Sequence, residues 1–275
     1  MNIDTEIENQ ESWPPRLLKE LTLYRETILC YQKERLRIDE LCQNNIAMRI
    51  NTPKNQYGDD YAQLAARCDT LLASYRFVAY HCTRLTSKEI ANIQKNGLRV
   101  LSPTLVQRRL QECLDSGHLS QDEYQHLKNN GNIKSNLANK NGYRTGMIWL
   151  CPNRSTLKDS GSVYRLFRSW GGEAVYNGQE NDAKISTTLA KIGSPCIVKC
   201  TIPFAATNPS REEIAKRLMS QFVADQFDFP DPSPGFDLFT RQGVPACRVT
   251  KVIDFDDAMF ENLTECRNWG ARHRL

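Results

Sequence analysis

Residues 77–98 read FVAYHCTRLTSKEIANIQKNGL. The apolar run Phe77–Tyr80 predicts a buried strand that delivers His81 at its end, and a short helical pattern then leads to Gly97–Leu98. A lone histidine is usually structural. This one stands at the tip of a strand beside Thr83, where ligands are commonly held. We therefore take its imidazole as a candidate hydrogen-bonding group for a ligand hydroxyl.

The chain around this stretch alternates between helical and strand patterns, which favours an α+β fold. Ser120 and Glu123 form a capping box that marks the start of one helix. We expect loops over 129–143 and 227–235, where Asn, Gly, Pro and Asp are dense. We expect helices over 86–95, 103–115, 119–127, 162–170, 182–192 and 210–222, and strands over 147–150, 173–176, 195–203 and 247–255.

The segment before residue 77 has a different character. Apolar residues at helical spacing predict a long helix over 15–46 and a second helix over 61–75, with a polar break over 51–60 between them. We interpret 1–76 as an antiparallel helical hairpin that precedes a catalytic domain over 77–275. A loose partner-binding arm is the alternative, and the sequence does not separate the two.

The composition is that of an ordinary soluble protein. No apolar run reaches the roughly 18 residues of a membrane span, and the acidic N-terminus lacks the features of a secretory signal. The net charge of +4 neither requires nor excludes nucleic acid. The ten cysteines include no CxxC pair, so we expect reduced thiols in a cytoplasmic protein and no bound metal.

Two later segments carry further candidate residues. The run GMIWL at 146–150 predicts a short strand, and Ser160, Ser162 and Tyr164 follow it. Tyr164 is either a core aromatic or a flat surface for a planar, partly cationic ring.

The second of these segments is Trp170–Gly172, which is followed by Glu173. This pattern is either a helix end with an exposed carboxylate or a sharp turn that presents the carboxylate to a ligand. In the second case Glu173 could stabilise a developing cation and accept a proton from a nucleophile.

Together the three segments resemble the ADP-ribosyltransferase superfamily, specifically its His-Tyr-Glu branch of poly- and mono-ADP-ribosyltransferases. Residues 77–98 also resemble the DNA-targeting ADP-ribosyltransferase toxins of bacterial toxin–antitoxin systems. The resemblance covers roughly residues 77–255. It implies a split antiparallel sheet with flanking helices, and catalytic roles for His81, Tyr164 and Glu173.

The resemblance also implies NAD as the substrate that supplies ADP-ribose. The expected NAD contacts come from the first two motifs and their neighbouring arginines, namely His81, Thr83, Arg84, Gly97, Leu98, Tyr164 and Arg165. Arg144, Arg154 and Arg168 also lie near the second motif. Because Glu173 lies closer to Tyr164 than the family pattern places its glutamate, Asp237 and Asp254 stand as alternative catalytic acids.

The function that follows is mono-ADP-ribosyl transfer from NAD to a macromolecular acceptor, either protein or nucleic acid. A bacterial toxin, effector or defence role fits this activity, and so does an inhibitory partner. The alternatives are a non-catalytic nucleotide- or partner-binding module on the same fold, an NAD hydrolase, or a relative of the NAD-dependent RNA phosphotransferases.

Overall fold

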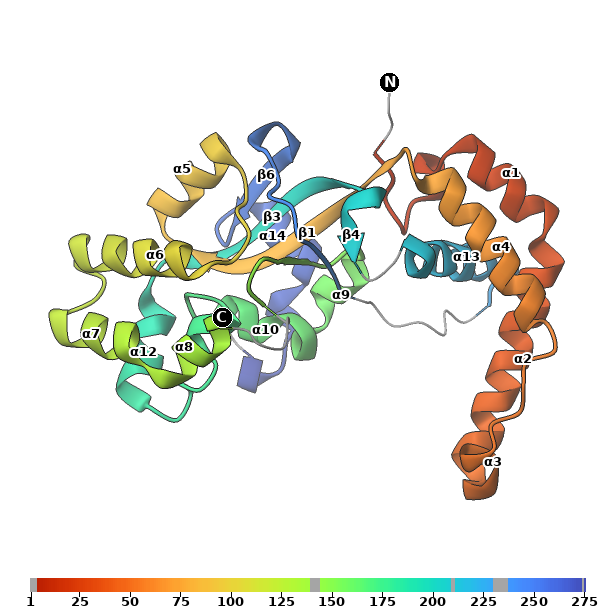
Figure 1. Ribbon diagram of the computed structural model, residues 1–275, viewed down its shortest axis with the longest axis horizontal. Coiled ribbons are helices and arrows are strands. Elements are labelled where there is room, and N and C mark those ends of the chain that lie inside the picture. The colour runs from red at the N-terminus through yellow and green to blue at the C-terminus, as the bar shows by residue number, and fades with distance from the viewer. Residues whose placement is uncertain (1–3, 139–143, 209–210, 230–236, 274) are drawn as a thin grey trace. The chain divides into compact units, whose positions relative to one another are not determined.

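The computed structural model describes residues 4–138, 144–208, 211–229, 237–273 and 275. It is an α+β protein, mostly helical, with two small antiparallel three-stranded sheets (Figure 1). Within those described ranges no helix is long and apolar enough to cross a membrane. The chain divides into two compact units. Unit 1 comprises residues 1–78 and 203–236, and unit 2 comprises 79–202 and 237–275.

Unit 1 is built on helices that pack through an apolar core. Leu17, Leu21, Leu64 and Leu218 are fully buried in it. The long helix α13 packs against α4 and α2, so a segment far along the sequence completes the N-terminal helical unit (Figure 1). The elements are η1 (Gln10–Ser12), α1 (Pro15–Leu23), α2 (Arg25–Asn44), α3 (Ile46–Ile50), α4 (Gly58–Leu72), η2 (Phe204–Ala206), β4 (Thr207–Asn208) and α13 (Arg211–Phe227).

A buried polar contact joins α2, α4 and α13. The side-chain amide of Gln32 donates to the hydroxyl of Ser220 at 2.8 Å. Tyr61 stacks on Tyr31 with ring centroids 3.7 Å apart, and its hydroxyl bonds to the carbonyl of Lys216 at 3.3 Å. Paired polar groups of this kind specify one arrangement of helices, because the alternatives leave them unsatisfied.

The strands of unit 2 pair in the first sheet in the order β1-β3-β6. Cys196 of β3 lies opposite Asp254 of β6, and the register shifts by a bulge between Lys199 and Cys200. In the second sheet β2 pairs antiparallel with β5, with Trp149 opposite Phe239. The strands are β1 (Arg76–Leu85), β2 (Ile148–Leu150), β3 (Ser194–Pro203), β5 (Leu238–Thr240) and β6 (Val249–Asp254), and η3 (Ala246–Arg248) precedes β6.

Several helices of unit 2 contribute to one apolar cluster. Its members include Leu127 and Leu189, both fully buried, together with Trp170 and Tyr176. The helices are α5 (Ser87–Asn96), α6 (Pro103–Asp115), α7 (Gln121–Asn129), α8 (Gly131–Ala138), α9 (Arg154–Lys158), α10 (Ser160–Arg168), α11 (Glu173–Tyr176), α12 (Ala183–Lys191) and α14 (Ala258–Thr264), with η4 (Cys266–Asn268) and η5 (Ala271–His273) at the end.

Local sequence signals explain several of these boundaries. Thr86 caps α5, and the reciprocal bonds between Thr86 and Glu89 form a complete capping box. The predicted capping box of Ser120 and Glu123 is confirmed at the start of α7. The predicted strands over 147–150 and 195–203 are confirmed as β2 and β3. Most residues of β3 are buried, whereas in β2 Ile148 and Leu150 are buried and Trp149 between them is exposed.

The expected strand over 173–176 is wrong. These residues form the short helix α11, and the carbonyl of Gly172 accepts from the backbone N–H groups of Val175 and Tyr176. Gly171 and Gly172 both have positive φ, +95° and +67°, and this turns the chain back on itself. Val175 and Tyr176 can then both enter the apolar cluster, whereas a strand would send them to opposite faces.

Two other expectations need correction. The loop expected over 129–143 contains helix α8, because the side chain of Asn130 accepts from the N–H groups of Asn132 and Ile133 and so starts it. Residues 139–143 lie outside the described residues. The single helix expected over 15–46 is interrupted at Tyr24 and Asn45, which separate α1, α2 and α3.

We expect Gly97→Ala to destabilise the fold strongly. Gly97 has φ +80°, and a Cβ there would lie 2.0 Å from the backbone oxygen of Val244. Backbone cannot move away cheaply, so the free energy of unfolding should fall by more than about 2 kcal/mol.

Gly117→Ala is the matched control for this test. It has a similar φ of +73° with no atom within 4 Å of the added Cβ, so only the conformational penalty of about 1 kcal/mol applies. Urea unfolding of both variants measures the difference. Equal losses would show that the close approach to Val244 is not a constraint.

Candidate functional site

His81 lies within β1, which continues to Leu85, so the prediction that His81 ends its strand is wrong. Tyr80 forms an antiparallel bridge with Cys151, the residue after β2, and Nδ1 of His81 bonds to the carbonyl oxygen of Trp149 at 2.8 Å. A carbonyl only accepts, so Nδ1 carries the proton and Nε2 of the neutral ring is an acceptor. Burial lowers the pKa of His81 and the charge of Arg109 lowers it further, against the effect of the Trp149 bond. The ring is therefore neutral at physiological pH.

A buried polar network surrounds the carboxylate of Glu89. The carboxylate of Glu89 accepts from Nε of Arg109, from the indole N–H of Trp170 at 2.9 Å and from the backbone N–H of Thr86 at 2.8 Å. The guanidinium of Arg109 also lies over the Trp170 ring, 4.7 Å from its centroid. Burial alone would raise the pKa of Glu89, but Arg109 and these donors outweigh it and hold the pKa below its ordinary value. We call Glu89, Arg109 and Trp170 the Glu89 network.

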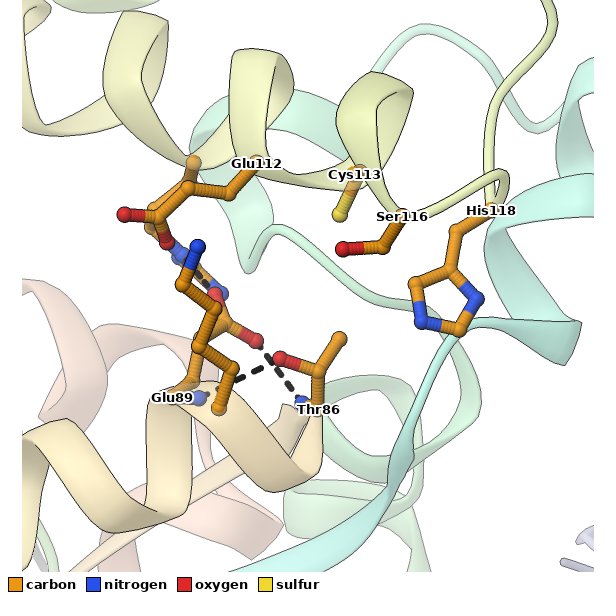
Figure 2. A pocket seen from close by; sticks show the side chains of 8 residues that line it. Thr86, Glu89, Glu112, Cys113, Ser116 and His118 are labelled. Atoms are coloured by element: carbon orange, nitrogen blue, oxygen red, sulfur yellow. Dashed lines mark hydrogen bonds and ion pairs between the residues drawn. The ribbon is translucent and has the colours of Figure 1, made fainter.

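A small pocket opens on one side of this network (Figure 2). Thr86 and Glu89 face Cys113, Ser116 and His118 across it, and its volume is about 30 Å³. That is the space of about one water molecule, so the pocket does not fit a dinucleotide. Lys88, Arg109 and Glu112 complete the lining.

The pocket brings a thiol and an imidazole together without making a nucleophile. Burial and the charge of Glu89 raise the pKa of Cys113 to about 12, so the thiol stays protonated. Within the described parts of the chain no three His, Cys, Asp or Glu side chains gather as metal ligands. All ten cysteines are free thiols.

Two of the candidate carboxylates have different partners. Glu173 begins α11 and forms an ion pair with Arg144 at 3.0 Å, with 45% of its side chain exposed. Asp237 directly precedes β5 and accepts from the thiol of Cys151 at 3.6 Å. Burial raises the pKa of Asp237; the Cys151 bond opposes this and the charge of Glu173 adds to it. Two carboxylates thus differ in their environments, as the acid and base of a catalytic pair do.

The cysteines near this pair are inert. A hydrogen bond with Cys82, burial and the charge of Asp237 raise the pKa of Cys151 well above its ordinary value. The thiol of Cys151 is therefore a neutral donor to Asp237 and not a nucleophile.

Tyr164 lies on α10 and faces the C-terminal segment of the chain. Its ring lies 4.8 Å from the ring of His273, whose Nδ1 bonds to the hydroxyl of Ser160 at 2.9 Å. Phe167, one turn further along α10, packs on Trp269 of the same segment. The expected stacking surface is thus partly covered by the chain itself.

Four other residues expected to contact NAD have structural roles. Arg84 donates to the carbonyls of Ile192 at 2.8 Å and Phe167 at 3.1 Å, which lie at the ends of α12 and α10. Arg84 thereby supplies hydrogen-bond donors to backbone carbonyls at the ends of helices, where no partner exists within the helix. Gly97 ends α5, and Leu98 bonds to Val244 in both directions at 2.9 Å. Thr83 is buried in β1.

The arginines of α10 share one carboxylate. Arg165 and Arg168 both pair with Glu180, and both guanidinium groups lie within 6 Å of the ring centroid of Tyr176. Arg154 donates to the hydroxyl of Tyr80 at 3.2 Å. The alternative acid Asp254 accepts from the backbone N–H groups at 256 and 257, which gives it a role in the turn after β6.

The structure therefore joins some of the candidate residues and not others. It pairs Glu173 with Arg144, and it bonds His81 to Trp149 of β2. The partners of Tyr164 lie in the C-terminal segment instead. Sequence reasoning missed Arg109, which lies on α6 far from any motif. The one available signal was the capping-box position of Glu89.

Comparison with known proteins adds no relative. No family model, curated protein or solved structure matches the chain. The chemistry of the site must therefore be argued from its own residues.

We expect Asp237→Asn to stabilise the protein at pH 7. A carboxyl whose folded pKa lies above its unfolded value of 3.8 favours the folded state only when protonated, so its ionised form opposes folding at neutral pH. The amide resembles the protonated carboxyl in shape. The gain should shrink as the pH falls toward 3.8, where the unfolded carboxyl also protonates.

Asp256→Asn, at an exposed residue of the same unit, should change stability by less than about 0.5 kcal/mol. Urea unfolding at pH 7 and pH 5 measures both variants. A loss of stability in Asp237→Asn at pH 7 would mean that the charge of Asp237 supports the fold.

Proposed function

We propose that this protein cleaves the nicotinamide–ribose bond of NAD and transfers ADP-ribose to a macromolecular acceptor. The observation that carries the proposal is the contrast between two carboxylates of unit 2: Glu173 is ion-paired with Arg144, whereas Asp237 accepts a hydrogen bond from the thiol of Cys151, the residue after β2. Breaking an N-glycosidic bond places positive charge on the ribose, and a carboxylate stabilises that charge. The sheet would then be a version of the split antiparallel sheet of ADP-ribosyltransferases.

We assign a catalytic role to each carboxylate from its environment. Glu173, about half exposed and paired with Arg144, is the carboxylate that stabilises the cationic sugar as nicotinamide leaves with the bonding electrons. Asp237, with its raised pKa, is the better proton acceptor and takes the proton of the attacking acceptor group. Nε2 of His81 would accept a hydrogen bond from a ribose hydroxyl, because Nδ1 already donates to the carbonyl oxygen of Trp149.

The acceptor would be a protein or a nucleic acid, and water in its place would make the protein an NAD hydrolase. A toxin, effector or defence role, with an inhibitory partner, would fit a transferase in the cytoplasm. The same fold without catalysis is the second candidate. Two observations favour it: Tyr164 packs on His273, and Arg84 is committed to backbone carbonyls.

The direct test is the release of nicotinamide from NAD by the full chain, followed by chromatography, with mass spectrometry of cell extract to find ADP-ribosylated products. We expect release by the wild type. Glu173→Gln should slow it by about 10²–10³-fold, because the amide keeps the shape but loses the charge.

Glu265→Gln is the matched control for Glu173→Gln. Glu265 is also an ion-paired glutamate of unit 2, with 49% of its side chain exposed, and it pairs with Lys158. It should leave the rate unchanged. If the wild type binds NAD but releases no nicotinamide, the protein is a binding module.

We expect His81→Ala to weaken NAD binding. The loss of a hydrogen bond to a buried ligand costs about 1–3 kcal/mol, which corresponds to roughly 5- to 150-fold in Kd. His118→Ala removes an imidazole that lines only the small pocket and should leave the affinity unchanged. Calorimetry measures both variants. An unchanged Kd in folded His81→Ala would remove His81 from the site.

A further inference from the structure

Trp170 and Glu173 are close in sequence and differ sharply in their surroundings. Trp170 is 1% exposed, whereas Glu173 is exposed at the start of α11. We propose that Trp170, held by the buried carboxylate of Glu89, is a positioning residue that fixes the turn carrying Glu173. The inference rests on the proposed function for the role of Glu173, and it adds the residues that hold this carboxylate in place.

Three separate contacts fix the place of Trp170. Its indole N–H donates to Glu89 at 2.9 Å, its backbone N–H donates to the carbonyl of Leu189 at 3.0 Å, and its ring meets the guanidinium of Arg109. Of these three contacts, only the hydrogen bond to Glu89 requires the indole nitrogen. Glu89 keeps Arg109 and the Thr86 N–H if the indole bond is lost.

Between Trp170 and Glu173 the chain has only Gly171 and Gly172. Both have positive φ, and glycine is the residue with the greatest backbone freedom. The turn is defined mainly by its ends: the Trp170 ring on one side and, on the other, the packing of Val175 against Gly171, where a Cβ would lie 2.6 Å from the Val175 Cβ. Loosening the first end leaves a flexible link before the carboxylate.

The charge of this network also acts on the other candidate residue. Arg109 is held by Glu89, and its positive charge helps to lower the pKa of His81. Glu89 thus holds both the residue that begins the turn to Glu173 and the arginine whose charge acts on His81. A buried carboxylate with partners in both directions suits a residue that holds reacting groups in fixed relative positions.

Trp170→Phe tests this directly, because it removes the indole N–H and keeps an aromatic ring in the core. Trp269→Phe is the matched control. Trp269 is also a buried tryptophan of unit 2, and its indole N–H donates to the carbonyls of Lys158 and Thr264, remote from Glu89. Thermal unfolding verifies that both variants fold. The two readouts are amide hydrogen exchange over 171–176 and the kcat and KM of nicotinamide release.

We expect exchange over 171–176 to accelerate about tenfold in Trp170→Phe and to stay at the wild-type rate in Trp269→Phe. We expect kcat to fall about tenfold in Trp170→Phe while KM stays within about twofold, because a misplaced carboxylate weakens transition-state stabilisation more than binding. Trp269→Phe should keep the wild-type kcat.

Wild-type exchange over 171–176 in Trp170→Phe would overturn the proposal, and so would an unchanged kcat. If the wild type releases no nicotinamide, the proposed function fails. The exchange comparison then decides separately whether Trp170 fixes the turn.

Discussion

The carboxylate of Glu89 is buried, and it is tolerated there only because a guanidinium, an indole N–H and a backbone N–H all meet it. These donors come from α5, α6 and the turn before α11, so one charge ties three parts of unit 2 together. Removing one partner of such a pair leaves the other charge buried without a partner, and this typically lowers the free energy of unfolding by about 3–5 kcal/mol. Trp170 also belongs to the apolar cluster, so the network and the core hold each other in place.

The candidate site lies at the margin of this rigid region. Glu173 follows two glycines with positive φ, and His81 lies within β1, where its Nδ1 donates to the carbonyl oxygen of Trp149 in β2. The surroundings of these residues differ: His81 is kept neutral, Glu173 has an arginine partner, and Asp237 is partly desolvated. Different environments for neighbouring titratable groups are a recurring feature of catalytic sites, and here they arise from residues that contribute little to packing.

Local signals in the sequence were sufficient for much of the fold. The capping box at Ser120 and the apolar run of β3 depend on neighbouring residues alone, and they predicted their elements correctly. The strand predicted over 173–176 was wrong because tertiary contacts of Val175 and Tyr176 impose a helix there. Asp237 was foreseen only as an alternative, and Arg109 was missed, because contacts between α6 and the Trp170 turn leave no periodic trace in the sequence.

The most direct test of this account is a crystal structure with a carbocyclic NAD analogue, whose nicotinamide bond cannot be cleaved. The account places the nicotinamide-bearing ring between the carboxylates of Glu173 and Asp237, with a ring hydroxyl within hydrogen-bond distance of Nε2 of His81. An analogue bound away from both carboxylates, or no binding at saturating concentration, would contradict it.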